Sequence, residues 1–217
     1  MIKNIVFDFN GTLVDDLDIS IDALNECIKK YLPNRELVSK EEYLEIFRFP
    51  VGPLYEELGF DFTKIDYNEL ANFFISYYES RAFNECKLFE EVQQVLNSLK
   101  NKGYNLYILS ASYIDLLIEM LKKYAILEYF DGLVALENKH GGSKIERGKE
   151  YFAQHKINPS ECIMIGDTIH DIEVAHELGM NCISYDRGHN SHSKLKKVNK
   201  NVISSLTEII DIINRNS

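Results

Sequence analysis

The stretch "IVFDFNGTLVDD", from Ile5 to Asp16, passes from an apolar run into a turn within a few residues. The apolar run predicts a buried strand, because parallel strands that are covered on both faces read as continuous apolar segments. Asp8 stands where this strand ends, and Gly11 with Thr12 indicates a sharp turn directly after it. A carboxylate at the carboxyl end of a strand lies where open α/β sheets bind their ligands.

Four more apolar runs follow along the chain, and each has a helical pattern beside it. Strands that alternate with helices are typical of a parallel sheet whose two faces are covered by helices. The sequence therefore predicts the α/β class, with a Rossmann-like parallel sheet as its core. The five predicted strands are residues 3–9, 105–111, 132–136, 162–167 and 181–186.

The first two predicted strands end about a hundred residues apart, whereas a βαβ unit needs only about 30. This distance predicts an insertion after the first strand, made of helices with the turn-like segments "FPVGP" and "ELGFDF" between them. Helices are predicted over residues 18–32, 39–47, 66–83 and 89–104. We expect a discontinuous core domain of residues 1–15 and 84–217 and a small helical cap domain of residues 16–83.

The composition excludes several classes of partner. The net charge is −10, and no basic stripe interrupts the acidic chain, so we expect no nucleic-acid partner. No apolar run approaches the roughly 18 residues of a membrane span, and the N-terminus lacks a signal-peptide pattern, so we expect no membrane partner. Four cysteines without CxxC spacing favour free thiols in a reducing cytoplasm. The pattern does not predict an oligomeric state.

Polar residues with related chemistry stand at or just beyond the other strand ends. Ser110 follows the run "LYIL", Lys144 lies in "GGSKIERGK", and Asp167 and Asp171 lie four residues apart in "MIGDTIHD". Together with Asp8 they are expected to meet at one edge of the sheet. A carboxylate can attack phosphorus, acidic oxygens hold Mg²⁺, and hydroxyl and ammonium groups compensate the charge of phosphate oxygens. The set suits phosphoryl transfer.

With these four motifs in this order, the chain resembles the haloacid dehalogenase superfamily, in particular its phosphoglycolate-phosphatase-like branch, which carries a helical cap after the first motif. The resemblance covers nearly the whole chain. It implies a Mg²⁺-dependent phosphohydrolase that acts on a small phosphorylated metabolite through an aspartyl phosphate. By this resemblance Asp8 is the nucleophile, the phosphoryl group is bound by Thr12, Ser110, Ala111 and Lys144, and Mg²⁺ is held by Asp8, the backbone carbonyl of Asn10, Asp167 and Asp171.

Asn10 departs from the family pattern D-x-D-G-T, in which aspartate at this position protonates the leaving group and then activates water. An amide cannot exchange that proton, so a general acid-base contribution of about 10²–10⁴-fold is lost. Three explanations stay open. The substrate has a good leaving group, such as an acyl or aryl phosphate; the residue is an engineered Asp-to-Asn change that traps a complex; or the protein is a non-catalytic phosphate-binding or regulatory protein. Turnover separates the first from the last.

Two assignments have competitors nearby. Ser112 lies close to the same strand end, but Ser110 directly follows the apolar run and is preferred. Lys139 and Lys149 flank Lys144, which is preferred because its distance from Asp167 is close to what the family resemblance implies for the intervening helix.

Three further residues have both a functional and an ordinary surface interpretation. Arg48, in "FRFPVG", is a candidate for reading a carboxylate or second phosphate of the substrate, since its planar fork suits such groups, although an exposed charge at a helix end has the same appearance. His189 and His192, in "GHNSH", lack metal-ligand spacing, so we expect a polar surface loop there.

Overall fold

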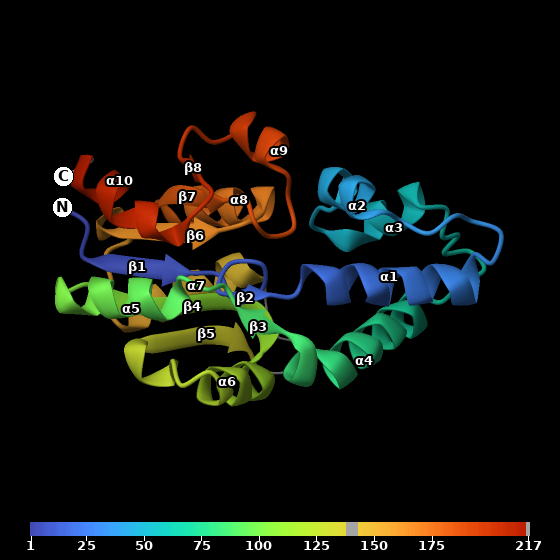
Figure 1. The fold of residues 1–217 in the computed structure, drawn as a ribbon, viewed down its shortest axis with the longest axis horizontal. Helices are drawn as coiled ribbons and strands as arrows, with labels where there is room; N and C mark the ends of the chain where they lie inside the picture. The colour runs from blue at the N-terminus through green and yellow to red at the C-terminus, as the bar shows by residue number, and fades with distance from the viewer. Residues whose placement is uncertain (138–142, 216–217) are drawn as a thin grey trace.

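The structure, a computed structural model, describes residues 1–137 and 143–215. Its centre is a six-stranded sheet with parallel pairing throughout, in the order β5-β4-β1-β6-β7-β8 (Figure 1). The predicted α/β fold with a Rossmann-like sheet is confirmed. Its strands are β1 Asn4–Phe7, β4 Asn105–Tyr113, β5 Gly132–Leu136, β6 Cys162–Gly166, β7 Asn181–Tyr185 and β8 Val202–Ile203.

Helices cover both faces of the sheet. Buried residues of α5, α6 and α10 pack with one face, and buried residues of α7 and α8 pack with the other. The helices of this part are α5 Val92–Asn101, α6 Ile114–Lys123, α7 Lys144–Gln154, α8 Ile169–Leu178, α9 His192–Lys196 and α10 Ile209–Arg215, with short 3-10 helices at Leu127–Tyr129, Pro159–Glu161 and Leu206–Glu208.

Strand β1 shows why the first apolar run has no polar alternation. Ile5 and Phe7 belong to the apolar cluster on one face, whereas Val6 belongs to the cluster on the other. All three side chains are fully buried, and β1 pairs with β4 on one side and β6 on the other. Both faces and both edges of this strand are therefore covered, which leaves only its carboxyl end free for chemistry.

A helical insertion, Leu17–Glu85, extends away from the sheet (Figure 1). The chain enters it through β2 and leaves through β3, two short strands that pair antiparallel. Most buried apolar residues between positions 17 and 70 form a cluster of their own, while Ile19, Ala82 and Cys86 pack with the sheet. The elements are β2 Val14–Asp15, α1 Leu17–Tyr31, α2 Lys40–Ile46, α3 Val51–Glu57, α4 Tyr67–Glu85 and β3 Lys87–Leu88. The division at residues 16 and 83 stays a prediction that this packing supports.

The turn predicted at "FPVGP" is wrong for most of its length, because α3 begins at Val51. Pro50 stands just before the helix and Pro53 lies in its first turn. Proline is tolerated there because the first backbone N–H groups of a helix have no partner inside it. The prediction placed a turn over these residues, whereas here both prolines stand at a helix start.

The three shortest strands, β2, β3 and β8, were not predicted, since two residues carry no readable periodicity. Among the described residues, no helix is both long enough and apolar enough to cross a membrane. All four cysteines carry free thiols, and three of them are buried.

Replacing Ile5 with alanine tests the central strand. We expect the free energy of unfolding to fall by about 2–5 kcal/mol, because the side chain is fully buried and its removal leaves a cavity. Urea unfolding followed by circular dichroism measures this change. Leu37→Ala is the matched control: its side chain is 49% exposed, and the expected change is within about 0.5 kcal/mol. Equal losses in both variants would contradict the proposed packing.

Candidate active site at the carboxyl edge of the sheet

Three buried carboxylates lie side by side at the carboxyl ends of neighbouring strands. Asp8 directly follows β1, Asp167 directly follows β6, and Asp171 lies in the first turn of α8. One carboxylate oxygen from each lies within 4.8 Å of the others. The structure thus brings together the acidic residues of the first and last motifs, although Asp8 and Asp167 are 159 positions apart in the sequence.

Lys144 joins this cluster from α7. Its Nζ lies 2.6 Å from Asp8 Oδ1 and 2.7 Å from Asp171 Oδ1, and all three side chains are buried. Ser143 begins α7 with a capping box, which fixes the helix start and therefore the point from which the lysine reaches inward. Of its two competitors, Lys149 is exposed, and Lys139 lies outside the described residues.

The remaining carboxylate oxygens are also held in place. Asp167 Oδ1 accepts a hydrogen bond from Thr12 Oγ1 at 2.9 Å, and its Oδ2 accepts one from the backbone N–H of His189 at 2.7 Å. Asp171 Oδ2 accepts from the hydroxyl and backbone N–H of Thr168 at 2.7 and 3.0 Å, which completes the capping box of α8. Asp171 therefore both caps a helix and pairs with the buried lysine.

Two glycines allow the backbone to approach the cluster closely. Gly11 has φ +72°, and a Cβ there would lie 2.3 Å from Asp167 Oδ2 and 2.6 Å from a ring carbon of His189. A Cβ on Gly188 would lie 2.2 Å from the same oxygen. Real Cβ atoms do not approach this closely, so both positions need glycine.

Burial and mutual repulsion shift the acidity of the cluster. Burial raises the pKa of Asp8 to about 8, with smaller additions from the other two carboxylates, although the charge of Lys144 opposes this shift. Burial likewise raises the pKa of Asp167 to about 6, against the effect of the neighbouring His189. For Asp171 burial also acts upward, but Lys144 and the bonds from Thr168 hold its pKa below the usual value. The single positive charge of Lys144 therefore does not neutralise the three carboxylates of the cluster.

The donor set fits a hard divalent cation. Carboxylate oxygens are the ligands that Mg²⁺ and Ca²⁺ prefer, and three of them converge here from buried residues. The raised pKa values of Asp8 and Asp167 describe carboxylates that additional positive charge would keep ionised. Asp8, Asp167 and Asp171 could therefore hold Mg²⁺.

Asn10 lies beside the cluster, with its side-chain amide fully engaged. Its Nδ2 donates to Asp16 Oδ2 at 2.9 Å and to the Tyr78 hydroxyl at 2.5 Å. Its Oδ1 accepts from Ser112 Oγ at 2.6 Å. Ser112 belongs to β4, Asp16 is the N-cap residue of α1, and Tyr78 lies on α4. The amide therefore connects the sheet edge to the insertion.

The second half of β4 supplies further polar groups, and the strand runs on to Tyr113, beyond the end expected near Ser110. Ser110 is buried, and its Oγ accepts from the backbone N–H of Ser112 at 3.1 Å, whereas Ala111 is exposed. Arg147 Nη2 donates to the Ser110 carbonyl at 3.0 Å. Since Lys144 and Arg147 are three residues apart on α7, they share one helix face, and both positive side chains reach this edge of the sheet.

The expectation that His189 lies in a surface loop is wrong. Its side chain is buried, with Nε2 3.1 Å from Asp16 Oδ1 and Nδ1 3.1 Å from the Tyr43 hydroxyl. Burial acts to lower the pKa of His189, but Asp16 outweighs it and raises the value to about 9. The same contact, with the bonds from Tyr78 and Asn10, holds the pKa of Asp16 below its usual range despite burial. His192, by contrast, is more than half exposed.

Arg48 makes its contacts within the insertion. Its guanidinium lies 2.6 Å from a Glu57 carboxylate oxygen and donates to the Pro53 carbonyl at 3.2 Å. Among the described residues, no hydrogen bond or ion pair joins it to the acidic cluster. The neighbouring ring of Phe47 does reach the site, with its centroid 5.0 Å from that of His189.

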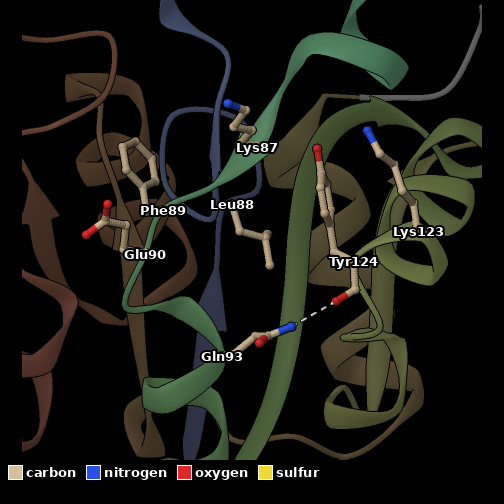
Figure 2. A pocket seen from close by; sticks show the side chains of 7 residues that line it. All are labelled: Lys87, Leu88, Phe89, Glu90, Gln93, Lys123 and Tyr124. Carbon is tan, nitrogen blue, oxygen red and sulfur yellow. Dashed lines mark hydrogen bonds between the residues drawn. The ribbon is translucent and has the colours of Figure 1, made fainter.

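A surface pocket of about 430 Å³ lies elsewhere, beside β3 and the start of α5 (Figure 2). Lys87, Phe89, Lys123 and Tyr124 are among its lining residues, and none of its lining belongs to the acidic cluster. The Gln93 amide donates to the Tyr124 carbonyl at 3.1 Å across its lower part. This pocket is therefore separate from the acidic cluster.

Sequence reasoning missed Asp16, Tyr43, Tyr78 and Arg147 as neighbours of the site. Asp16 and Arg147 each follow a recognised motif within a few residues, so proximity along the chain was an available signal. The two tyrosines lie on the insertion, where several aromatic side chains pack against one another and no local pattern distinguishes those that face the sheet.

Comparison with known proteins gives the same family as the motifs. A family profile described as haloacid dehalogenase-like hydrolase matches residues 5–185. The pyrophosphatase PpaX of Bacillus velezensis is 29% identical over 177 residues, which cover 81% of this chain and 79% of that protein.

Solved structures share the fold. A haloacid dehalogenase-like hydrolase from Streptococcus pneumoniae superposes with a TM-score of 0.81 at 24% identity, covering 98% of both chains. A predicted phosphoglycolate phosphatase from Haemophilus somnus gives 0.77 at 19% identity, also covering 98% of both chains. The second similarity spans the helical insertion as well as the sheet, since it covers nearly all of this chain.

Gly11→Ala is expected to damage both the fold and the acidic cluster, because its Cβ would meet Asp167. Gly59→Ala is the matched control: Gly59 also has positive φ, at +98°, but nothing lies within 4 Å of its added Cβ. Backbone strain alone costs about 1–2 kcal/mol, so the control should lose about that much stability and Gly11→Ala clearly more. Urea unfolding and Mg²⁺ titration calorimetry compare the two variants. Equal losses with unchanged Mg²⁺ binding would refute the close approach.

Proposed function

The chain belongs to the haloacid dehalogenase-like hydrolase family, and on that premise we propose that it is a Mg²⁺-dependent phosphohydrolase acting on a small phosphorylated metabolite. Asp8 attacks the phosphorus atom, an aspartyl phosphate forms as the leaving group departs, and water then hydrolyses it. The observation that carries the proposal is the buried contact of Lys144 with Asp8 and Asp171, beside a third carboxylate.

The phosphoryl group would be bound at the ends of β1 and β4. Ser110 and the backbone N–H of Ala111 would donate to its oxygens from one side, and Lys144 from the other. Lys144 already lies 2.6 Å from the attacking carboxylate, so an oxygen of the transferring group can reach its ammonium without a large movement. Thr12 would contribute at the turn after β1, and its hydroxyl already holds Asp167 in place.

Asp8, Asp167, Asp171 and the carbonyl of Asn10 would hold Mg²⁺. When bound, the ion would supply positive charge that neutralises phosphate oxygens. The chain's own residues then do the positioning: Lys144 screens the two carboxylates that it touches, and Thr12 with the His189 backbone fixes the third.

The residue at position 10 narrows the substrate class. Asn10 cannot protonate a leaving group, so substrates whose leaving oxygen is stable as an anion are favoured: phosphoric anhydrides, acyl phosphates and aryl phosphates. The relative PpaX is a pyrophosphatase by name, and inorganic pyrophosphate has such a leaving group. Ordinary alcohol esters are expected to react slowly.

The helical insertion would act as a cap that excludes bulk water from the reaction. Arg48 would read a carboxylate or second phosphate of the substrate only after leaving Glu57, which now holds it. The four free thiols favour the cytoplasm as the place of the reaction.

A non-catalytic phosphate-binding protein is the alternative function, and Asn10 is the observation that favours it. The amide removes the usual acid-base group, while the phosphate-binding and cation-binding residues remain. Such a protein would bind phosphate and Mg²⁺ without turnover, so measured hydrolysis separates the two functions.

Hydrolysis of p-nitrophenyl phosphate, acetyl phosphate and pyrophosphate is expected to require both Mg²⁺ and Asp8. Asp8→Asn should lower kcat by 10³-fold or more, since an amide is not a useful nucleophile here, and EDTA should remove the activity of the unmodified protein. Released phosphate is measured colorimetrically. Asp115→Asn, an exposed change in the first turn of α6, is the control and should keep the full rate.

If the unmodified protein binds Mg²⁺ and phosphate by calorimetry but hydrolyses none of these substrates, the binding function replaces the catalytic one. Activity that survives Asp8→Asn would place the nucleophile elsewhere.

Lys144→Gln is expected to lower kcat/KM for aryl phosphates by about 10²–10³-fold, because a donor to the transferring phosphoryl group is lost. The comparison is with Lys149→Gln, which removes an exposed lysine from the same helix and should change little. Steady-state kinetics with p-nitrophenyl phosphate give both values. Similar rates for the two variants would remove Lys144 from the mechanism.

A further inference from the structure

Both N–H groups and the oxygen of the Asn10 side chain make hydrogen bonds, and these partners fix the orientation of the amide. Nδ2 donates to Asp16 Oδ2 and to the Tyr78 hydroxyl, and Oδ1 accepts from Ser112 Oγ at 2.6 Å. Rotating the amide by half a turn would set its oxygen against the Asp16 carboxylate, where two acceptors would face one another without a proton between them. Only the observed orientation satisfies all of these groups.

Asp16 is committed to the same junction. It stands at the N-cap position of α1, where aspartate normally accepts a bond from the backbone, yet its side chain makes no capping bond. Oδ2 instead accepts from Asn10 at 2.9 Å, from Tyr78 at 2.8 Å and from Ser20 at 3.4 Å, and Oδ1 meets His189 Nε2 at 3.1 Å. The Asp16 carboxylate therefore accepts hydrogen bonds from the core and from α4 instead of capping the N-terminus of α1.

These contacts join four parts of the chain. Asn10 belongs to the turn after β1, Ser112 to β4, Asp16 to the start of α1, and Tyr78 to α4. The first two stand at the sheet edge that carries the acidic cluster, and the last two belong to the helices that carry the insertion. The junction therefore sets how the insertion is placed over the candidate site.

Donor and acceptor numbers explain why an amide fits here. Tyr78 has one hydroxyl proton, which it gives to Asp16, so it can only accept from Asn10. Aspartate at position 10 would remove both N–H donors and face a second carboxylate at about the 2.9 Å now spanned by the hydrogen bond. Like charges at that separation, with Asp16 buried and position 10 partly buried, are unfavourable.

We propose that Asn10 and Asp16 are a matched donor–acceptor pair, and that Asn10 is a positioning residue that fixes the insertion over the acidic edge. The family's carboxylate at position 10 is incompatible with the carboxylate at position 16, and exchanging the two residues restores the match. The effect on rate rests on the proposed function, whereas the effect on stability and placement does not.

The test is the set Asn10→Asp, Asp16→Asn and the double variant that carries both changes. Asn10→Asp should lower the folding equilibrium constant at least tenfold, and Asp16→Asn by about threefold, because asparagine keeps one acceptor oxygen. In the double variant, the amide at position 16 donates to the carboxylate at position 10. Adding Asp16→Asn should therefore recover most of the stability that Asn10→Asp loses.

Three readouts follow the four proteins. Urea unfolding gives the folding constants, and hydrogen exchange of α1 and α4 reports the placement of the insertion, which should loosen in Asn10→Asp and tighten again in the double variant. Steady-state kinetics with p-nitrophenyl phosphate should show kcat/KM at least tenfold lower for Asn10→Asp and regained in the double variant. Asn25→Asp is the control, since it changes the same residue type inside the insertion, where the Asn25 side chain exchanges its hydrogen bonds with the backbone of Val38.

A double variant as unstable as Asn10→Asp, or less stable, would overturn the pairing, and so would an Asn10→Asp variant that keeps wild-type stability and exchange. Should Asn10→Asp fail to fold, folding of the double variant supports the pair and its failure refutes it. If stability recovers in the double variant but the unmodified protein hydrolyses no substrate, the proposed function is wrong and the Asn10–Asp16 pairing is supported. If the unmodified protein is active but stability does not recover in the double variant, the pairing is wrong and the proposed function is unaffected.

Discussion

Charge compensation by Lys144 is the interaction on which the rest of the candidate site depends. Three carboxylates are buried at one edge of the sheet, and isolated buried charges are too costly to keep. A single ammonium, 2.6 and 2.7 Å from two of them, makes this arrangement possible. The capping box at Ser143 matters for the same reason, because it sets where α7 begins and hence where the lysine reaches the cluster.

The third carboxylate shows how the site draws on distant parts of the chain. Asp167 is held by Thr12 from the turn after β1 and by the backbone of His189 from the segment after β7. Both segments approach so closely that Gly11 and Gly188 leave no room for a Cβ. The ring of His189 continues outward to Asp16 and Tyr43 of the insertion region, so one chain of contacts runs from the sheet edge to the helices above it.

Much of this could be predicted because the signals are local. The strands were readable as apolar runs, since burial on both faces removes polar alternation, and the positions of Asp8 and Asp167 followed from the strand ends. Ser110 lies inside its strand instead, because β4 continues to Tyr113. The start of α3 was not predicted, because "FPVGP" has the composition of a turn and α3 begins inside it. His189 was misplaced on the surface because its partners lie 173 and 146 residues away along the chain. No spacing rule connects residues so far apart.

The sequence by itself determined the class of fold, the presence of an insertion and the residue types available for phosphoryl chemistry, because strand periodicity, turn residues and motif order are properties of neighbouring residues. Tertiary structure alone decided which polar groups meet. It paired Lys144 with two carboxylates, buried His189, and set the amide of Asn10 against Asp16 and Tyr78. Hydrogen bonds act over about 3 Å, and only the folded chain brings donors and acceptors from separate segments to that distance.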